Sequence, residues 1–354
     1  MKLSRLQLHQ FKNHTSLDLQ LDNDIVGICG LNGKGKTNIL DAIYFLAVGK
    51  SYFSSTDIQC IQIGKEEAGI IGKLESNEEI EFKLKLKRGS KKQLFKNEVV
   101  YPKLADHLGE LLCVMIAPGD IGLIYGDNSD RRRFVNQVLS QTDSEYLKGL
   151  MQYRRLLEQR NRHLKSGIID GALLDALDAL MLPLNELIFH KRKELLREIG
   201  PMISKFYEQI SEKAEQVSLD YDSQISAGNL EEQIRGSRQK DSIIKRSHIG
   251  IHKDKIEFSI ESKALKKFGS QGQIKSFLIA LKLSEFNYYL DNKKTTPILL
   301  LDDIFEKIDN QRSQALIRII KNGNFGQVFV TDTDKSRLSS FCSGVSESYK
   351  LVEL

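Results

Sequence analysis

The octapeptide Gly30-Leu31-Asn32-Gly33-Lys34-Gly35-Lys36-Thr37 matches the phosphate-binding loop pattern G-x-x-x-x-G-K-[ST] in full. An apolar run at residues 25–29 precedes it, and a helix-like run at residues 38–46 follows it. A strand, a glycine loop and a helix N-terminus form the context in which this motif binds phosphate. The alternative is a glycine-rich turn that happens to contain Lys-Thr, which these flanks disfavour.

The loop predicts a site for ATP and Mg²⁺. Its glycines let successive N–H groups point at phosphate oxygens, and the helix end adds partial positive charge. Lys36 would reach the β- and γ-phosphates as a catalytic cation, and the Thr37 hydroxyl would bind Mg²⁺. The residues predicted to surround the phosphates are Gly30, Leu31, Asn32, Gly33, Lys34, Gly35, Lys36, Thr37 and Asn38.

Composition predicts a soluble, cytoplasmic protein with two domains, or with one large domain that carries an insertion. The chain has 354 residues, of which 40% are hydrophobic and 28% charged. It shows no signal-peptide pattern and no apolar stretch near the roughly 20 residues of a membrane span. Its 4 cysteines are widely spaced, as reduced core thiols are. A net charge of +5 does not by itself indicate a polyanionic partner.

Hydrophobic periodicity predicts an α/β frame interrupted by helices. Period-two alternation marks strands near the N-terminus and a meander over residues 68–97, and residues 111–116 form an apolar strand. From about residue 130 to 216, helical spacing indicates a hairpin or small bundle whose two helices are separated at 167–171. A strand-helix-strand pattern resumes near residue 248. We therefore expect a head domain at 1–125 and 245–354, with an inserted lobe at 126–244.

The run Pro297-Ile298-Leu299-Leu300-Leu301-Asp302-Asp303 reads as a buried strand that ends in two carboxylates. Beside a phosphate loop, Asp302 would hold Mg²⁺ directly or through water. Asp303 stands where a general base would polarise the attacking water. The alternative is a strand capped by acidic residues before a turn, which the presence of the phosphate loop disfavours.

The segment Phe268-Gly269-Ser270-Gln271-Gly272-Gln273 opens an amphipathic helix, with Ser270 at the N-cap position. An ordinary N-cap after a glycine turn is one interpretation. The segment also resembles the signature motif of ABC-type ATPases, and it precedes the acidic strand by one helix, as in those proteins. That resemblance implies that Ser270, Gly272 and Gln273 bind the γ-phosphate held by the phosphate loop of a second subunit.

Taken together, these motifs resemble the RecF family of SMC-like ABC ATPases. The matching pieces span most of the chain. The more specific ones are Gln159-Arg160-Asn161 and Gly250-Ile251-His252-Lys253-Asp254. The others are residues 8–13, 32–38, 117–120, 131–134, 153–155, 270–273 and 300–305, and Asp309 occupies the position of the D-loop acid. The resemblance implies an α/β ABC-type ATPase head with a P-loop mixed sheet, an antiparallel β meander and an inserted helical lobe.

The resemblance also implies a function. The protein would be a weak, DNA-stimulated ATPase of recombinational repair, replication recovery and the SOS response. ATP would close a homodimer on double-stranded or gapped DNA, and RecR-type and RecO-type partners would help to load the recombinase. Rival interpretations are an ATP-binding scaffold without hydrolysis, another SMC-like ATPase and a transporter ATP-binding subunit. The last is disfavoured because about 230 residues separate Thr37 from Ser270.

Four departures, from the family pattern or from that of most ABC ATPases, bear on the reaction. Lys34 stands where serine is usual, and Gly119 replaces an acidic residue. The base position holds Asp303, as in RecF, instead of the longer glutamate of most ABC ATPases. Residues 328–333 lack the usual switch histidine. We therefore expect slow hydrolysis, suited to a timed switch.

A basic hairpin is the candidate DNA contact. Alternation places Lys83, Lys85 and Lys87 on one strand face, and Arg88 follows them. This stripe suits phosphate backbones, but lysines also protect solvated sheet edges, and both interpretations remain open. Further basic clusters at 131–133, 154–155 and 191–193 have few aromatic neighbours, which favours duplex backbone over single strands. His252 lacks companion metal ligands, so we expect it to pack near the nucleotide or the junction of the lobes.

Overall fold

The computed structural model describes residues 2–75, 79–167, 170–212, 215–307 and 309–354. The chain folds into two compact units. Unit 1 contains residues 1–120, 206–213 and 275–354, and unit 2 contains residues 121–205 and 214–274. Across the described residues, no helix combines the length and the apolar character needed to cross a bilayer.

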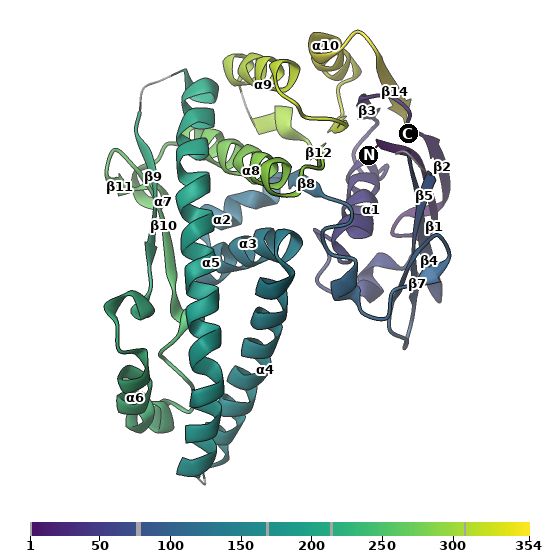
Figure 1. The fold of residues 1–354 in the computed structure, drawn as a ribbon. Helices are drawn as coiled ribbons and strands as arrows, with labels where there is room; N and C mark the ends of the chain where they lie inside the picture. The colour runs from purple at the N-terminus through teal and green to yellow at the C-terminus, as the bar shows by residue number, and fades with distance from the viewer. Residues whose placement is uncertain (1, 76–78, 168–169, 213–214, 308) are drawn as a thin grey trace. The chain divides into compact units, whose positions relative to one another are not determined.

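A parallel sheet of 5 strands, in the order β14-β3-β13-β12-β8, forms the centre of unit 1. Its strands are β3 (Ile25–Cys29), β8 (Cys113–Ile116), β12 (Ile298–Leu301), β13 (Val328–Asp332) and β14 (Tyr349–Glu353). All but the edge strand β14 are fully buried, which explains why they read as continuous apolar runs. Helix α1 (Lys36–Val48) follows β3 after the loop at residues 30–35 (Figure 1). It contacts β8 and β13.

A second sheet in unit 1 is antiparallel and has the order β2-β1-β4-β5-β6-β7. Its strands are β1 (Lys2–Phe11), β2 (His14–Gln20), β4 (Glu67–Glu75), β5 (Glu79–Lys87), β6 (Gln93–Lys96) and β7 (Val99–Val100). One face packs on α1 through residues such as Leu6, Ile70 and Leu84. The opposite face carries the alternating polar residues, so the sheet is half buried as the sequence pattern predicts.

Further helices complete unit 1. Helix α9 (Asn310–Asn322) contacts α10 (Lys335–Val345), and α10 packs on β3 and β13. Helix α8 (Gln271–Lys293) begins in unit 2 and continues into unit 1 just before β12. The cysteines Cys29, Cys60, Cys113 and Cys342 are buried and free, as expected of reduced core thiols.

Unit 2 is built on helices and a small sheet. Helix α4 (Ser144–Ser166) ends at Gly167, whose φ of 81° is in the left-handed region. It lies beside α5 (Gly171–Ser211), to which the buried Arg160–Asp178 ion pair joins it (Figure 1). The remaining elements are α2 (Gly122–Tyr125), α3 (Asn128–Thr142), α6 (Leu230–Ile244), α7 (Leu265–Phe268), β9 (Val217–Asp222), β10 (Lys255–Ile260) and β11 (Lys263–Ala264).

The predicted fold class is confirmed, but the compact units differ from the expected domain bounds. The first part of unit 1 ends at 120 instead of 125, and unit 1 also contains residues 206–213, which were expected in the inserted lobe. The largest difference is the return to the head, which was expected at 245, whereas the units divide between 274 and 275. The reason is a sheet of order β11-β10-β9 that the sequence did not reveal, because β9 is short and half exposed. Strand β10 pairs with β9 from Lys255↔Asp222 to Ile260↔Val217, which keeps these residues in unit 2.

Candidate nucleotide-binding site

The phosphate loop follows β3 directly and ends where α1 begins at Lys36. Gly33 and Gly35 have φ values of 83° and 98°, which L side chains rarely adopt. A Cβ atom on Gly35 would also lie 2.4 Å from His14 Nε2. Both glycines are therefore required by the geometry of the loop, which supports the phosphate-loop interpretation over an accidental turn.

Side chains from the β1–β2 turn brace this loop. Asn13 Nδ2 donates to Gly33 O at 3.0 Å, and His14 Nε2 lies 3.1 Å from Gly35 O, so this nitrogen carries the proton. Asn38 Nδ2 in turn donates to Asn13 Oδ1 at 2.7 Å. Neither Asn13 nor His14 is predicted as a site residue from the sequence. The available signals are a polar pair at a hairpin turn and the family-like stretch 8–13, which ends at Asn13.

Lys36 and Thr37 occupy the first turn of α1. Lys36 is buried, and its Nζ donates to Gly30 O at 2.8 Å and to Leu31 O at 3.4 Å. These bonds hold the ammonium group against the phosphate loop, where a bound phosphate would lie. By contrast, Leu31, Asn32, Gly33 and Lys34 are exposed. Their N–H groups and the second cation are thus accessible to a ligand at the loop.

The acidic pair after β12 meets the phosphate loop. Asp302 Oδ1 accepts hydrogen bonds from Thr37 Oγ1 at 2.8 Å and from Thr331 Oγ1 at 2.9 Å. Thr331 lies on β13, the strand between β3 and β12, and its hydroxyl also accepts from Asp303 N at 3.0 Å. Thr331 is not predicted from the sequence, because the family pattern at residues 328–333 points only to a missing histidine.

Asp303 has a φ of 42°, in a region that non-glycine residues seldom occupy. Such backbone strain persists where surrounding contacts impose it, and it is common at functional sites. Here the bond from Asp303 N to Thr331 and the bond from Asp302 N to Ile116 O hold the turn on both sides. The turn therefore fixes two adjacent carboxylates at the ends of parallel strands.

The residues present fit Mg²⁺. Thr37 and Asp302 supply a hydroxyl and a carboxylate oxygen, the hard donors that this ion prefers, and Mg²⁺ usually takes its remaining ligands from phosphates and water. No set of three or more His, Cys, Asp or Glu side chains in the described part of the chain could hold a metal. When bound, the ion would neutralise charge on the β- and γ-phosphates.

We expect the affinity for Mg²⁺–ATP to fall as the pH drops below about 6. Burial raises the pKa of Asp302 to about 6, although the Thr37 and Thr331 hydroxyls oppose this shift. Below that pH the folded site holds a proton that Mg²⁺ must displace, which costs about tenfold in affinity per pH unit. Titrations of a fluorescent ATP analogue from pH 5 to 8, with and without Mg²⁺, measure this loss. An identical pH dependence in Asp302→Asn would contradict the assignment.

Ser270, Gly272 and Gln273 lie in unit 2 at the start of α8. Gln273 N donates to Ser270 Oγ at 3.2 Å, and Ser270 N donates to Gln273 Oε1 at 2.7 Å. This reciprocal arrangement is a capping box, so the predicted N-cap is present. Ser270 itself is exposed and accessible to a second molecule. The Gln273 side chain is held further by Glu215 Oε1, at 3.0 Å from Nε2.

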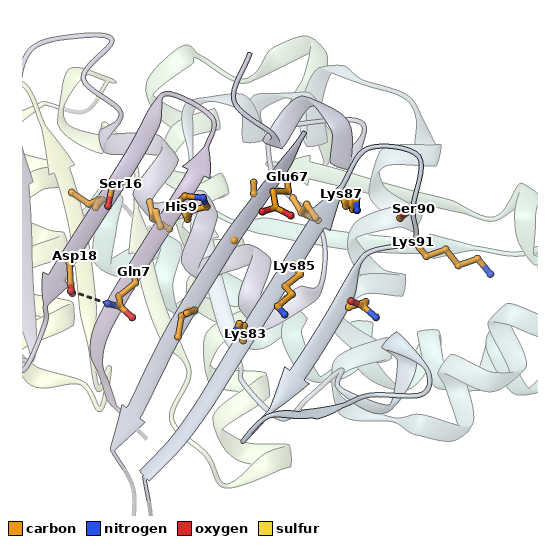
Figure 2. Close-up of a pocket in the computed structure, with 17 residues that line it drawn as sticks. Gln7, His9, Ser16, Asp18, Glu67, Lys83, Lys85, Lys87, Ser90 and Lys91 are labelled. Atoms are coloured by element: carbon orange, nitrogen blue, oxygen red, sulfur yellow. Dashed lines mark hydrogen bonds between the residues drawn. The ribbon is translucent and has the colours of Figure 1, made fainter. Parts of the chain in front are cut away.

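The predicted DNA-binding lysines border a hollow on the exposed face of the antiparallel sheet. Phe82, Leu84 and Leu86 are buried, so Lys83, Lys85 and Lys87 point to the opposite side. Figure 2 shows these lysines along β5, with Lys91 beyond the turn. The hollow has a volume of about 690 Å³ and lies over Gly69, which contributes no side chain. We call this hollow, with Lys83, Lys85, Lys87 and Lys91, the lysine groove.

The charges of this hairpin differ in their partners. Lys92 pairs with Asp57 at 3.0 Å, and Lys96 pairs with Glu110 at 2.6 Å. Arg88 Nε donates to Lys65 O at 2.8 Å, which fastens the turn and occupies part of a predicted DNA contact. Within the described ranges, the four lysines of the lysine groove have no ion pair. The lysines of the hairpin that lack acidic partners therefore gather at this groove, whereas the predicted contact Arg88 is not among the residues that line it.

The fold and site define a P-loop ATPase of the kind found in ABC and SMC heads: a phosphate loop after β3, an acidic pair after β12 and an inserted helical unit. The chain belongs to the RecF/RecN/SMC N terminal domain family, whose model matches residues 2–347. It is 39% identical to the DNA replication and repair protein RecF of Porphyromonas gingivalis, covering 100% of this chain and 98% of that protein. It is 40% identical to RecF of Flavobacterium johnsoniae, with 100% of both chains covered.

Solved structures agree with this membership. The structure of the recombination mediator protein RecF with ATP, from the RecFOR pathway, matches with a TM-score of 0.87 and 25% identity, over 95% of this chain and 92% of that one. An Smc head bound to the C-terminal winged-helix domain of ScpA matches with a TM-score of 0.58 and 14% identity, over 96% and 91%. The second likeness concerns the fold alone.

Proposed function

We propose that this chain is an ATP-dependent DNA-binding protein of recombinational repair that acts as RecF does. ATP would close a homodimer on duplex DNA or at gaps, and slow hydrolysis would release it. The observation that carries the proposal is the contact of Thr37 with Asp302, which joins the phosphate loop to the acidic pair. Full-length similarity to proteins named for replication and repair supports the biological setting.

The remaining features of the proposal follow from that family. Weak ATPase activity stimulated by DNA, dependence on Mg²⁺, and partners of the RecR and RecO types would accompany a cytoplasmic, nucleoid-associated protein. One similar solved structure is that of a recombination mediator protein in the RecFOR pathway, which supports these partners. In this proposal, unit 1 is the ATP-binding head and unit 2 is the inserted lobe.

The oligomeric state tests the proposal. Sedimentation of the full chain should give dimers with ATP and DNA and fewer dimers with ADP. Single-turnover hydrolysis then separates an ATPase from a scaffold that only binds ATP. A protein that stays monomeric in every nucleotide state contradicts the ATP-closed dimer.

We expect Ser270→Arg to leave a folded monomer that binds ATP but does not dimerise. In a composite site Ser270 would donate to the γ-phosphate bound by the partner, and a bulky arginine would block closure. If Ser270 is only a helix cap, the substitution costs about 1 kcal/mol of stability and no more. Sedimentation with ATP and thermal unfolding distinguish these outcomes. Normal ATP-dependent dimers of the variant exclude the composite site.

Mixing provides the control for this prediction. A heterodimer of Ser270→Arg with Lys36→Ala holds one intact composite site, formed by Lys36 of the first chain and Ser270 of the second. Neither variant alone should hydrolyse ATP, whereas the mixture should recover part of the activity. Ser270→Arg alone, at the same total protein concentration, should stay inactive.

The lysine groove is the proposed contact for the duplex backbone. Lys83, Lys85 and Lys87 lie along β5, and Lys91 follows beyond the turn. None of the four has an acidic partner among the described residues, although Glu67 lies opposite Lys87 in the sheet register. Lysines contact phosphates without reading bases, so this surface would bind all sequences alike. Because β5 pairs with both β4 and β6, its lysines do not protect a free sheet edge, which supports the DNA interpretation over the protected-edge one.

We expect Lys83→Glu, Lys85→Glu and Lys87→Glu together to weaken duplex binding for every sequence. The slope of log affinity against log salt should fall by up to about 3, since each neutralised phosphate contributes about 0.9. Fluorescence anisotropy at several salt concentrations measures this slope. Lys293→Glu, Lys294→Glu and Lys321→Glu match the change in net charge at other exposed positions of unit 1. Equal slopes for the two triple variants would leave these lysines as a solvated strand face without a role in DNA binding.

A further inference from the structure

Three sequence segments that the ATP site does not use converge in unit 2. They are the arginine run 131–133 on α3, Tyr153-Arg154 on α4, and the stretch 250–254 before β10. They surround a pocket of about 230 Å³, which we call the arginine pocket. Its polar lining includes Arg132, Arg133, Arg154, Arg192, Tyr153 and His252.

The wall of the arginine pocket is held by a fixed hydrogen-bond network. The buried Arg192 donates to Ile251 O and Asp254 Oδ2, each at 2.7 Å, and to Asn136 Oδ1 at 2.9 Å. Asp254 Oδ2 also accepts from Tyr221 Oη at 2.5 Å. Asp254 thus neutralises Arg192, and the hydrogen bonds of Arg192 join α5 to the 250–254 stretch.

The Tyr153–His252 pair forms a neutral part of the wall. Tyr153 Oη lies 2.7 Å from His252 Nδ1, and His252 Nε2 lies 3.0 Å from Ser247 O. Because Nε2 must donate to this carbonyl, Nδ1 accepts from the tyrosine. Burial lowers the pKa of His252 to about 4, so the ring is uncharged at neutral pH. His252 therefore orients the wall and adds no charge, and its hydrogen bonds lie within unit 2.

The remaining arginines leave the pocket with excess positive charge. Arg133 lies 3.3 Å from Asp130. Arg132 donates to the main-chain oxygen of Asp254 at 2.6 Å, and neither it nor the exposed Arg154 has a carboxylate partner in the part of the chain that the structure describes. Burial and the nearby Arg192 both lower the pKa of Arg132. Lys253 has its pKa lowered by burial and then by Arg246 and Arg132.

We infer that the arginine pocket binds a phosphate group of a nucleic acid. Guanidinium groups present several N–H donors in a fixed fork, which suits phosphate oxygens better than a point charge does. Arg132 is held by the main chain, and the exposed Arg154 of α4 also lines the pocket. This inference rests on the proposed DNA binding and adds a second contact, separate in the sequence from the lysine groove.

Duplex binding by the full chain tests the inference. Arg154→Gln should weaken affinity roughly tenfold, the value of one hydrogen bond to a charged group, and reduce the salt slope by about 0.9. Arg132→Gln should act in the same direction. Arg162→Gln is the matched control, because Arg162 lies on the same helix, is 76% exposed and pairs with Glu158 outside the pocket. Arg154 is exposed, so its variant should unfold at the parental temperature, and equal duplex binding by Arg154→Gln and Arg162→Gln would overturn the inference.

Two further experiments identify the source of the phosphate and distinguish a failure of this inference from a failure of the proposed function. If the pocket holds a backbone phosphodiester, Arg154→Gln should weaken binding equally for duplexes with 5′-phosphate ends and for duplexes with 5′-hydroxyl ends. A loss confined to the phosphorylated duplex instead indicates a terminal phosphate. In a Lys36→Ala background, inorganic phosphate should protect Arg132 and Arg154, but not Arg162, from phenylglyoxal. If the parental chain binds no duplex, the proposed function fails, and absence of this protection independently rejects the pocket.

Discussion

Lys36→Ala should lower ATP affinity by about 10²-fold or more. The buried ammonium group lies against the phosphate loop, 2.8 Å from Gly30 O, where it can turn to the β- and γ-phosphates. A hydrogen bond between charged groups contributes about 1.5–3 kcal/mol, and burial of the lysine limits compensation by water. Calorimetric titration with ATP measures the change. The loss should be equally large with and without DNA, since it acts on nucleotide binding.

Two control variants make this result specific to Lys36. Lys34→Ala removes the exposed cation of the same loop, and Lys321→Ala removes a cation of α9. We expect a much smaller loss for Lys34→Ala and none for Lys321→Ala. ATP affinity of Lys36→Ala equal to that of the parental protein would overturn the assignment of the loop.

Asp303→Asn should keep ATP binding and slow hydrolysis by about 10²–10⁴-fold, the usual contribution of a general base. The amide is nearly isosteric but cannot accept a proton from water. The strained turn, with its bond from Asp303 N to Thr331, uses the main chain and should survive the change. Single-turnover hydrolysis measures the rate, and sedimentation should show accumulated ATP-bound dimers.

Asp334→Asn is the matched control, because Asp334 is an exposed N-cap of α10 and asparagine caps equally well. Asp303→Glu retains a carboxylate and should keep far more activity than Asp303→Asn. Parental hydrolysis rates in Asp303→Asn would show that another group activates the water.

Local patterns were enough to predict the α/β frame, its inserted helices and the main motifs, whereas the ABC-type head followed from the resemblance to a family. The glycines of the phosphate loop, the apolar strand before Asp302 and the alternation along β5 each lie within one short segment. Their chemistry depends on backbone conformation and on side-chain period, which neighbouring residues in the sequence determine. Ser270 was likewise recognisable as a helix cap, since its partner Gln273 lies three residues ahead.

Only the tertiary structure revealed what these motifs contact. Thr37, Asp302 and Thr331 meet because β13 lies between β3 and β12 in the sheet, an order that no local pattern contains. The same holds for the arginine pocket, which gathers α3, α4, α5 and the 250–254 stretch. Periodicity identifies which face of an element is buried, whereas strand order and helix packing depend on the burial of many elements at once. The sequence therefore determined the kinds of site, and the fold decided which distant side chains complete them.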